Sequence, residues 1–144
     1  MIKLKNIEVV LLILLLTPGC LVTDTNPAWS AGTIVEETQQ RSDGYFVSIA
    51  VSISDHAMSV TLEGAKLVYQ TGQNETIAES EIGTLNDETN RRVVVNATLS
   101  QRPKYILLKY DSISRSESVD GAVDGLVWRS GQGYVSYSGY RPEY

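Results

Sequence analysis

Cysteine, histidine and phenylalanine each occur once in this chain of 144 residues, and proline occurs four times. The single cysteine, Cys20, excludes an intramolecular disulfide and leaves its thiol for other chemistry. His56 is the single histidine. One cysteine and one histidine are too few for the ligand sets of the common zinc sites. We therefore expect neither a metal site nor a cofactor.

Basic residues are few and scattered. The chain has twelve Lys and Arg against seventeen Asp and Glu, which gives a formal net charge of −5 at pH 7. Arg91 and Arg92 form the only adjacent basic pair. Because proteins bind nucleic acid through clustered Lys and Arg that neutralise phosphates, nucleic acid is not expected as a partner.

Long apolar runs are missing as well. The longest, from Val9 to Leu16, is far shorter than the roughly 20 residues that a membrane-spanning helix needs. Lys3 and Lys5 precede this run, and small residues follow it. This order of basic, apolar and small residues is typical of a secretory signal, which is cut away after export.

The next residues, "TPGC" at 17–20, resemble the end of a lipoprotein signal peptide. In that family a small residue precedes a cysteine that is lipidated and becomes the new N-terminus, and Gly19 and Cys20 fit this pattern. Leu16 lies one place earlier than the leucine of the usual motif. Two alternatives stay open: a buried cysteine at the end of an apolar helix, and a retained single-span anchor.

We expect three segments: a signal peptide at 1–19, as the resemblance implies, a lipid-anchored tether at 20–31, whose Thr, Asp, Asn and Pro follow no period, and a folded β-sandwich domain at 32–144. The remaining chain is long enough for one domain with a core of its own. We expect the protein at the cell membrane, anchored through lipid on Cys20 and facing the extracytoplasmic side.

From residue 32 onward the dominant pattern has period two, which places alternate side chains on opposite faces of a β-strand. In "YFVSIAVSIS" at 45–54, four β-branched residues share one face, while serine and alanine share the other: Val47, Ile49, Val51 and Ile53. The dipeptide Asp43-Gly44 favours a tight turn. A hairpin is therefore expected between this strand and a shorter extended run before it.

Further strands are expected at 60–69, 91–100 and 104–110, with Gly64 marking a bulge or a bend between two short strands. Spacers rich in turn residues, such as "TLNDETN" and "SQRP", separate them. Short strands at this spacing, with hardly any helical periodicity, indicate an all-β fold: a single antiparallel β-sandwich after the N-terminal signal helix and short tether.

The segment from Tyr45 to Tyr110 resembles immunoglobulin-like and fibronectin-type modules of bacterial and archaeal surface proteins, particularly the adhesion-related domains of extracytoplasmic lipoproteins. The resemblance lies in the order of "VSIAVSIS", "GAKLVYQTGQNET", "IGTLNDETNRRVVVNATL" and "RPKYILLKY". The chain departs from antibody-type domains because it has no paired cysteines. The resemblance implies a fold but no particular function, since such sandwiches carry many unrelated functions.

Candidate catalytic and metal-binding patterns are sparse. Ser54, Asp55 and His56 are adjacent, but a catalytic triad requires a geometry that neighbouring residues do not usually adopt, so a turn is the favoured interpretation. Carboxylates on a loop can bind calcium, yet their spacing here favours an ordinary solvated loop. The four acidic residues concerned are Asp111, Glu117, Asp120 and Asp124.

Two N-glycosylation acceptor sequences, at Asn74 and Asn96, have meaning only in an exported chain. Asn74 lies in a predicted turn and is the better candidate acceptor. Asn96 lies in a predicted strand, on the face opposite Val93 and Val95.

The last part of the chain gathers aromatic residues among glycine and serine: Trp128, Tyr134, Tyr137 and Tyr140. Such side chains join a large apolar face to a polar group, which suits the surface of a glycan or a protein. The alternative is a final hairpin around 131–133, with Trp128 and Val135 packed inward and the tyrosines half-buried.

Together these patterns predict a noncatalytic extracytoplasmic lipoprotein, and not an enzyme, that acts as a cell-surface binding or structural module. Its expected partners are the membrane, through lipid on Cys20, and a surface protein or glycan. An accessory solute-binding component of a transport system is the alternative, and a surface hydrolase is the least favoured interpretation.

Overall fold

The computed structural model describes residues 29–55, 60–115, 121–123 and 125–137. These residues form ten β-strands and no helix, which confirms the all-β prediction. The strands are β1 (Trp29–Arg41), β2 (Gly44–Asp55), β3 (Val60–Gln70), β4 (Thr76–Asn86), β5 (Arg92–Leu99), β6 (Tyr105–Lys109), β7 (Ser112–Arg115), β8 (Gly121–Val123), β9 (Gly125–Arg129) and β10 (Gly133–Tyr137). The described part of the chain contains no helix long and apolar enough to cross a membrane.

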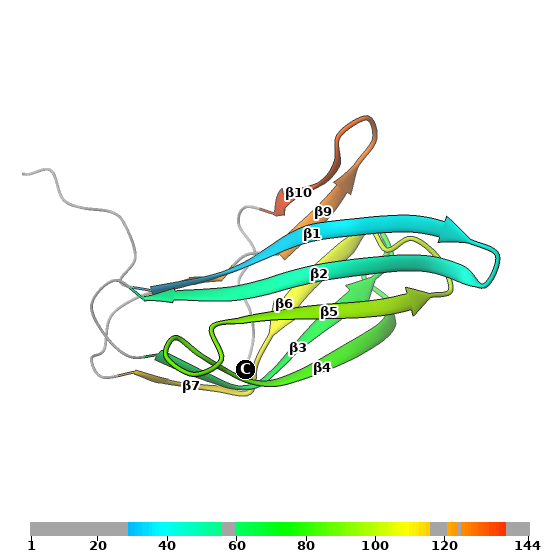
Figure 1. The fold of residues 1–144 in the computed structure, drawn as a ribbon. Helices are drawn as coiled ribbons and strands as arrows, with labels where there is room; N and C mark the ends of the chain where they lie inside the picture. The colour runs from blue at the N-terminus through cyan, green and yellow to red at the C-terminus, as the bar shows by residue number, and fades with distance from the viewer. Residues whose placement is uncertain (1–28, 56–59, 116–120, 124, 138–144) are drawn as a thin grey trace, which may run out of the picture.

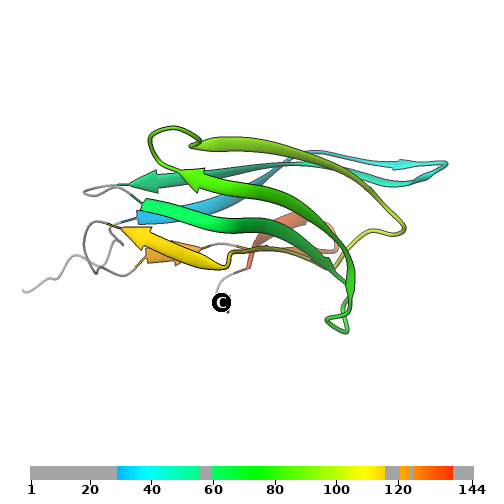
Figure 2. The ribbon, with the colours of Figure 1, turned by 90° about the horizontal axis from the view of Figure 1, so that it is seen from below.

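The strands build two sheets that pack face to face as a β-sandwich (Figure 1, Figure 2). One sheet has the order β5-β2-β1-β8, and the other has the order β10-β9-β6-β3-β4, with β7 also paired to β3. Neighbouring strands are antiparallel except for β1 and β8, whose residues 29–31 and 121–123 pair in parallel. That pair brings the beginning of the described chain beside a segment about 90 residues later.

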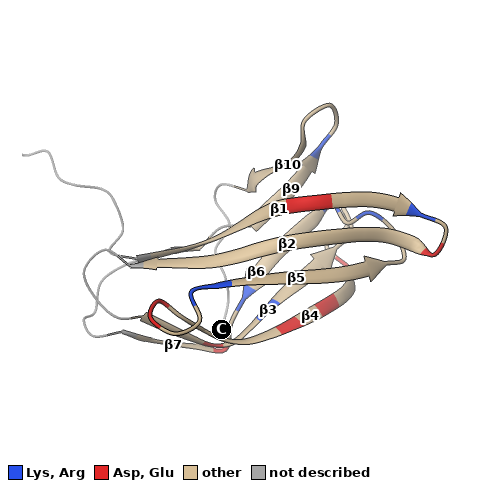
Figure 3. Ribbon diagram, viewed as in Figure 1, with Lys and Arg blue, Asp and Glu red and all other residues tan. Residues whose placement is uncertain are grey.

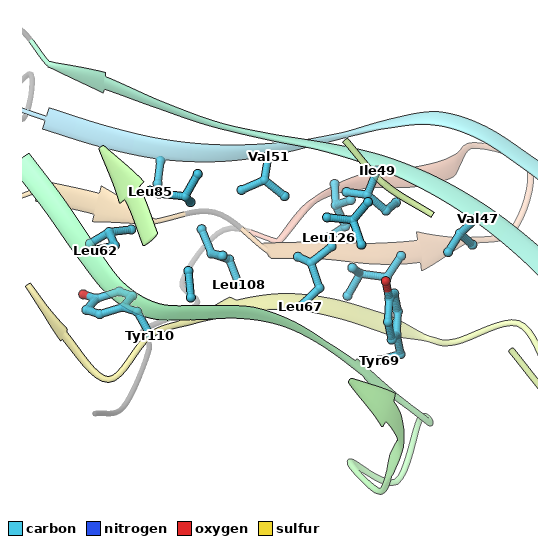
Figure 4. Packing of buried hydrophobic residues seen from close by; sticks show 14 of the residues in the cluster. Val47, Ile49, Val51, Leu62, Leu67, Tyr69, Leu85, Leu108, Tyr110 and Leu126 are labelled. Carbon is cyan, nitrogen blue, oxygen red and sulfur yellow. The ribbon is translucent and has the colours of Figure 1, made fainter. Parts of the chain in front are cut away.

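The hydrophobic core lies between the two sheets. The face of β2 predicted to be buried is almost fully inaccessible to solvent, with relative exposures of 0% for Val47, Ile49 and Val51. These side chains point toward Leu67 of β3 and Leu126 of β9 (Figure 4). Burying one large aliphatic side chain contributes about 1.5–3 kcal/mol, so each buried residue of this alternating face helps to hold the sheets together.

The hairpin of β1 and β2 is present as predicted, but its turn lies one residue earlier. Arg41 pairs with Gly44, so the two turn residues are Ser42 and Asp43. Gly44 has a φ of 144°, and a Cβ there would collide with the carbonyl oxygen of Leu99. Glycine is therefore required by its conformation and by the close approach of β5.

β1 is longer than the short run that the sequence predicted. It begins at Trp29, within the segment 20–31 expected to be a tether, and it pairs with β2 along its whole length. Residues 36–41 are all polar and exposed, so the sequence does not alternate after Val35. The strand nevertheless continues past a register shift between Val35 and Glu37, as strands do at a β-bulge.

Gly64 forms the predicted bulge, but β3 is one continuous strand and not two short ones. Its φ is 69°, and the register with β4 shifts on both sides of Ala65. The side chain of Asp111 occupies the space where a Cβ of residue 64 would lie. The bulge bends the strand while pairing continues on both sides.

Candidate functional site

A pocket of about 350 Å³ lies at one end of the sandwich, where three separate segments meet. The segments are the turn between β3 and β4, the connection between β5 and β6, and Trp128 of β9. The lining residues are Thr71, Gly72, Gln73, Glu75, Gln101, Arg102, Pro103, Lys104 and Trp128. Most of them are exposed, so the pocket is open to solvent.

Backbone hydrogen bonds around Lys104 hold the three segments together. The Lys104 amide donates to the carbonyl oxygen of Gln70 at 2.8 Å, and the Trp128 amide donates to the carbonyl oxygen of Lys104 at 2.8 Å. The Lys104 ammonium also donates to the carbonyl oxygen of Trp128 at 3.0 Å. The connection is therefore fixed to β3 on one side and to β9 on the other.

The guanidinium of Arg102 lies over the ring of Trp128. The guanidinium carbon of Arg102 lies 4.2 Å from the centre of the Trp128 ring system, within the range of a cation–π interaction. Tyr134 packs against the same indole in an edge-to-face arrangement, with the centroids 5.1 Å apart. The indole therefore contacts both Tyr134 and Arg102, and it orients the guanidinium at the pocket.

Tyr134 holds the connection between β5 and β6 in place through a hydrogen bond. Its hydroxyl donates to the carbonyl oxygen of Pro103 at 2.6 Å, and Pro103 is itself fully buried. Burial raises the pKa of Tyr134 above its ordinary value, with a further rise from Tyr45 and an opposing effect of Arg102. The phenol therefore stays protonated and remains a hydrogen-bond donor.

The turn at 71–75 is held by its own hydrogen bonds. The Thr71 amide donates to the carbonyl oxygen of Glu75 at 2.9 Å, and the Asn74 amide donates to that of Thr71 at 3.0 Å. The Thr71 hydroxyl oxygen accepts from the amides of Gln73 and Glu75. These bonds use the backbone groups of the turn and leave the side chains of Gln73 and Glu75 exposed.

The pocket is locally positive on an acidic protein. Arg102 and Lys104 face one acidic lining residue, Glu75, whereas the whole chain has a formal net charge of −5. Most acidic residues lie elsewhere, among them those on β1, on β4, at the turn between β1 and β2 and in the loop between β4 and β5 (Figure 3). Among the described residues, the ion pairs join Lys66 to Glu79 at 3.2 Å and Arg92 to Glu36 at 2.8 Å, so neither cation of the pocket is neutralised by an ion pair.

Of the aromatic residues predicted to bind a ligand, the structure brings two together. Trp128 lines the pocket and Tyr134 supports it, but Tyr137 stacks instead on Tyr105, with the centroids 5.1 Å apart. Tyr137 lies three positions beyond Tyr134 and therefore faces the other side of β10. Tyr140 lies outside the described residues.

The alternative for this part of the chain was a final hairpin, and its turn is confirmed. Arg129 pairs with Gly133, and Gly131 and Gly133 both have positive φ angles, 83° and 79°. The expected inward packing of Trp128 together with Val135 is wrong. Trp128 pairs with Tyr134, and Val135 is the next residue along β10, so the alternation of the strand puts it on the other face.

Both candidate glycosylation sites are exposed. Asn74 occupies the turn at the rim of the pocket with a left-handed φ of 66°. Asn96 lies on the outer face of β5, opposite Ser48 of β2, while Val95 points into the core. The predicted positions in a turn and on the outward face of a strand are therefore confirmed.

Several candidates fall outside the described residues: Cys20, His56, Glu117, Asp120 and Asp124. Asp111, the first carboxylate of the candidate calcium loop, is described, and its side chain lies against Gly64. Within the described ranges no three His, Cys, Asp or Glu side chains gather closely enough to hold a metal ion.

The sequence did not single out most of the pocket. Arg102 and Lys104 belong to a spacer that was recognised only as turn-rich, and Gln73 and Glu75 belong to a predicted hairpin turn. The available signal was two cations on either side of Pro103, immediately before a strand. The pairing of β6 with β3 and with β9 places this spacer beside Trp128, and that pairing could not be predicted from the sequence.

Comparisons of the chain with protein-family models, with curated proteins and with solved structures found no match. The chemistry of the pocket is therefore inferred from its own residues.

Proposed function

We propose that this protein is a noncatalytic, lipid-anchored module of the extracytoplasmic cell surface, built on an immunoglobulin-like or fibronectin-type sandwich, that binds a surface ligand through the pocket at Trp128. The observation that carries this proposal is the pocket itself. Three segments converge on it, and internal hydrogen bonds hold each of its walls in place.

The position of the pocket suits binding. Loops at the end of a rigid sandwich are a common location for recognition, because the sheets fix the loops while the loops vary in chemistry. An aromatic ring beside convergent polar groups is also typical of ligand sites. Here Trp128 supplies the ring, and Arg102 and Gln73 are among the polar groups.

Attachment to the membrane is supported by the sequence. The run from Val9 to Leu16 is too short to span roughly 30 Å of hydrocarbon as a helix, and Gly19-Cys20 fits a lipidation motif. Each buried methylene of an acyl chain contributes about 0.8 kcal/mol, and two chains are enough for stable anchoring where one is marginal. Lipid on Cys20 would therefore hold the sandwich at the surface.

Anchoring is tested by expressing the full chain and its Cys20→Ser variant in a host that processes lipoproteins. The wild type is expected in the membrane fraction, without residues 1–19 and with the mass of acyl chains on Cys20. The variant is expected to be released or to remain unprocessed. A wild-type membrane form that keeps residues 1–19 and carries no lipid would refute the anchor and favour a signal anchor.

Binding is tested by screening the full chain, purified in detergent, against arrays of surface glycans and against membrane proteins of the native cell. Trp128→Ala is expected to reduce the binding of any ligand found by at least tenfold, because it removes the platform of the pocket. Phe46→Leu is the matched control, since Phe46 also carries an arginine, Arg41, at 4.0 Å but does not line the pocket. Circular dichroism checks that both variants fold. The binding proposal fails if no ligand is found, or if Trp128→Ala binds as tightly as the control.

A further inference from the structure

The chemistry of the pocket points to a particular class of ligand, and the first indication is Arg102. Its guanidinium carbon lies 4.2 Å from the centre of the Trp128 ring system, and it takes part in no salt bridge among the described residues. A guanidinium that stacks on an aromatic ring keeps its N–H donors at the edge of its own plane. This donor edge matches the two oxygens of a carboxylate in a bidentate arrangement.

Lys104 adds a second positive charge to the same wall. One of its ammonium protons is used by the carbonyl oxygen of Trp128, at 3.0 Å, which fixes the position of the charge. An ammonium has three donors, so two remain for a ligand. Arg102 and Lys104 stand on either side of the buried Pro103, and the connection cannot shift easily because Tyr134 and β3 both hold it.

The rest of the lining is polar and mostly neutral. Gln73 and Gln101 are exposed amides, and each can both donate to and accept from a hydroxyl group. Glu75 can accept from a hydroxyl, and its charge offsets one of the two cations. The remaining charge of about +1 suits a monoanion such as a carboxylate better than a phosphate, which carries up to two negative charges.

The size of the pocket agrees with a small polar ligand. Its volume of about 350 Å³ lies at the lower end of the roughly 300–1,000 Å³ found for small-molecule sites. The lining offers one aromatic side chain and several polar ones, which argues against an acyl chain or an apolar peptide. Hydroxyl groups beside one carboxylate are the features of an acidic sugar.

We propose that the pocket binds a carboxylate-bearing sugar, a uronic acid unit of an acidic glycan, with Arg102 holding the carboxylate and Lys104 reinforcing it. Gln73, Gln101 and Glu75 contact the hydroxyl groups. This inference rests on the proposed binding function and deepens it by naming the ligand.

The test is calorimetric titration of the full chain in detergent with oligosaccharides of glucuronic or galacturonic acid, with neutral glucose oligosaccharides of the same length, and with a sugar phosphate. The acidic oligosaccharides are expected to bind at least tenfold more tightly than the neutral ones, and more weakly as salt is raised. Arg102→Ala is expected to weaken binding at least tenfold. Arg102→Lys is expected to fall between, because it keeps the charge and loses the bidentate geometry.

The control is Arg41→Ala, which removes the arginine stacked on Phe46 at 4.0 Å, outside the pocket. It should bind as the wild type does. Equal binding of neutral and acidic sugars, preference for the sugar phosphate, or unchanged affinity of Arg102→Ala would each overturn the assignment. If Trp128→Ala abolishes binding of a neutral glycan or a protein while Arg102→Ala does not, the binding function stands and the acidic ligand is wrong.

Discussion

At the scale of single residues, Gly64 shows how one backbone angle shapes the sandwich. Its φ of 69° is unfavourable for any residue with a Cβ, and the Asp111 side chain fills the adjacent space. We expect Gly64→Ala to lower the free energy of unfolding by about 2 kcal/mol, measured by urea denaturation.

The matched control for Gly64 is Gly83→Ala. Gly83 also has a positive φ, 96°, but no atom lies within 4 Å of its added Cβ. It should therefore cost only the conformational penalty of about 1 kcal/mol. Equal losses in the two variants would show that the contact with Asp111 contributes nothing.

Thr33 is the residue whose native side chain is expected to reduce stability. It is 5% exposed, and its hydroxyl is buried without a hydrogen-bond partner. Because a buried polar group without a partner is costly and valine has nearly the same shape, Thr33→Val should raise the free energy of unfolding by about 1 kcal/mol. Urea denaturation measures the change, and a loss of stability would indicate that the hydroxyl does find a partner in solution.

At the scale of elements, the two faces of β5 differ clearly in their exposure to solvent. Val95 is 9% exposed and belongs to the core, whereas its neighbour Val94 is 47% exposed. Val95→Thr should cost about 1–3 kcal/mol because it buries a hydroxyl. Val94→Thr should stay within about 0.5 kcal/mol of the wild type, since threonine is equally suited to a strand. Equal effects of the two variants would contradict the orientation of this strand.

Strands with regular alternation were the part of the fold that could be predicted. β2 and β5 follow the period-two rule, and their faces were correctly assigned before any pairing was known. β1 was predicted too short because its first four residues, 29–32, include serine, alanine and glycine and show no clear alternation of apolar and polar side chains. The pairing of β1 with β8 carries no local signal at all, because the contact depends on the closure of the whole sheet.

The turns could be predicted from the sequence, but the contacts that their side chains make could not. The spacer "TLNDETN" contains Asp87, which is 5% exposed and accepts a hydrogen bond from the Val60 amide at 2.9 Å. The spacer "SQRP" contains Arg102, one of the two cations of the pocket. Composition identifies such segments as irregular, but it does not say which side chain turns inward or which other loop lies beside it.

At the scale of the whole molecule, burial of tyrosine makes stability depend on pH. Burial raises the pKa of both Tyr69 and Tyr134 above the ordinary value of 10.0, while a hydrogen bond with Ser80 partly opposes the shift of Tyr69. The unfolded chain therefore loses these protons at lower pH than the folded protein does. Their contribution to stability is complete below pH 10 and is lost as the pH rises above it.

We accordingly expect the free energy of unfolding to fall as the pH rises above about 10, by up to about 1.4 kcal/mol per pH unit for each buried phenol. Tyr134→Phe should be less stable at pH 8, because it loses the bond to Pro103, and should show a shallower decline above pH 10. Urea denaturation at a series of pH values measures both effects. An identical decline in the variant would exclude Tyr134 as a source of the pH dependence.

The irregular pairing of β3 and β4 has a consequence for self-association. β4 is the last strand of its sheet, its register against β3 shifts at three places, and Glu79 and Glu81 are exposed along it. A bulged strand that carries negative charge is a poor template for a strand from another molecule, whereas a flat apolar edge would recruit one. Copies of the protein can therefore be concentrated side by side without joining through this edge into a continuous fibre.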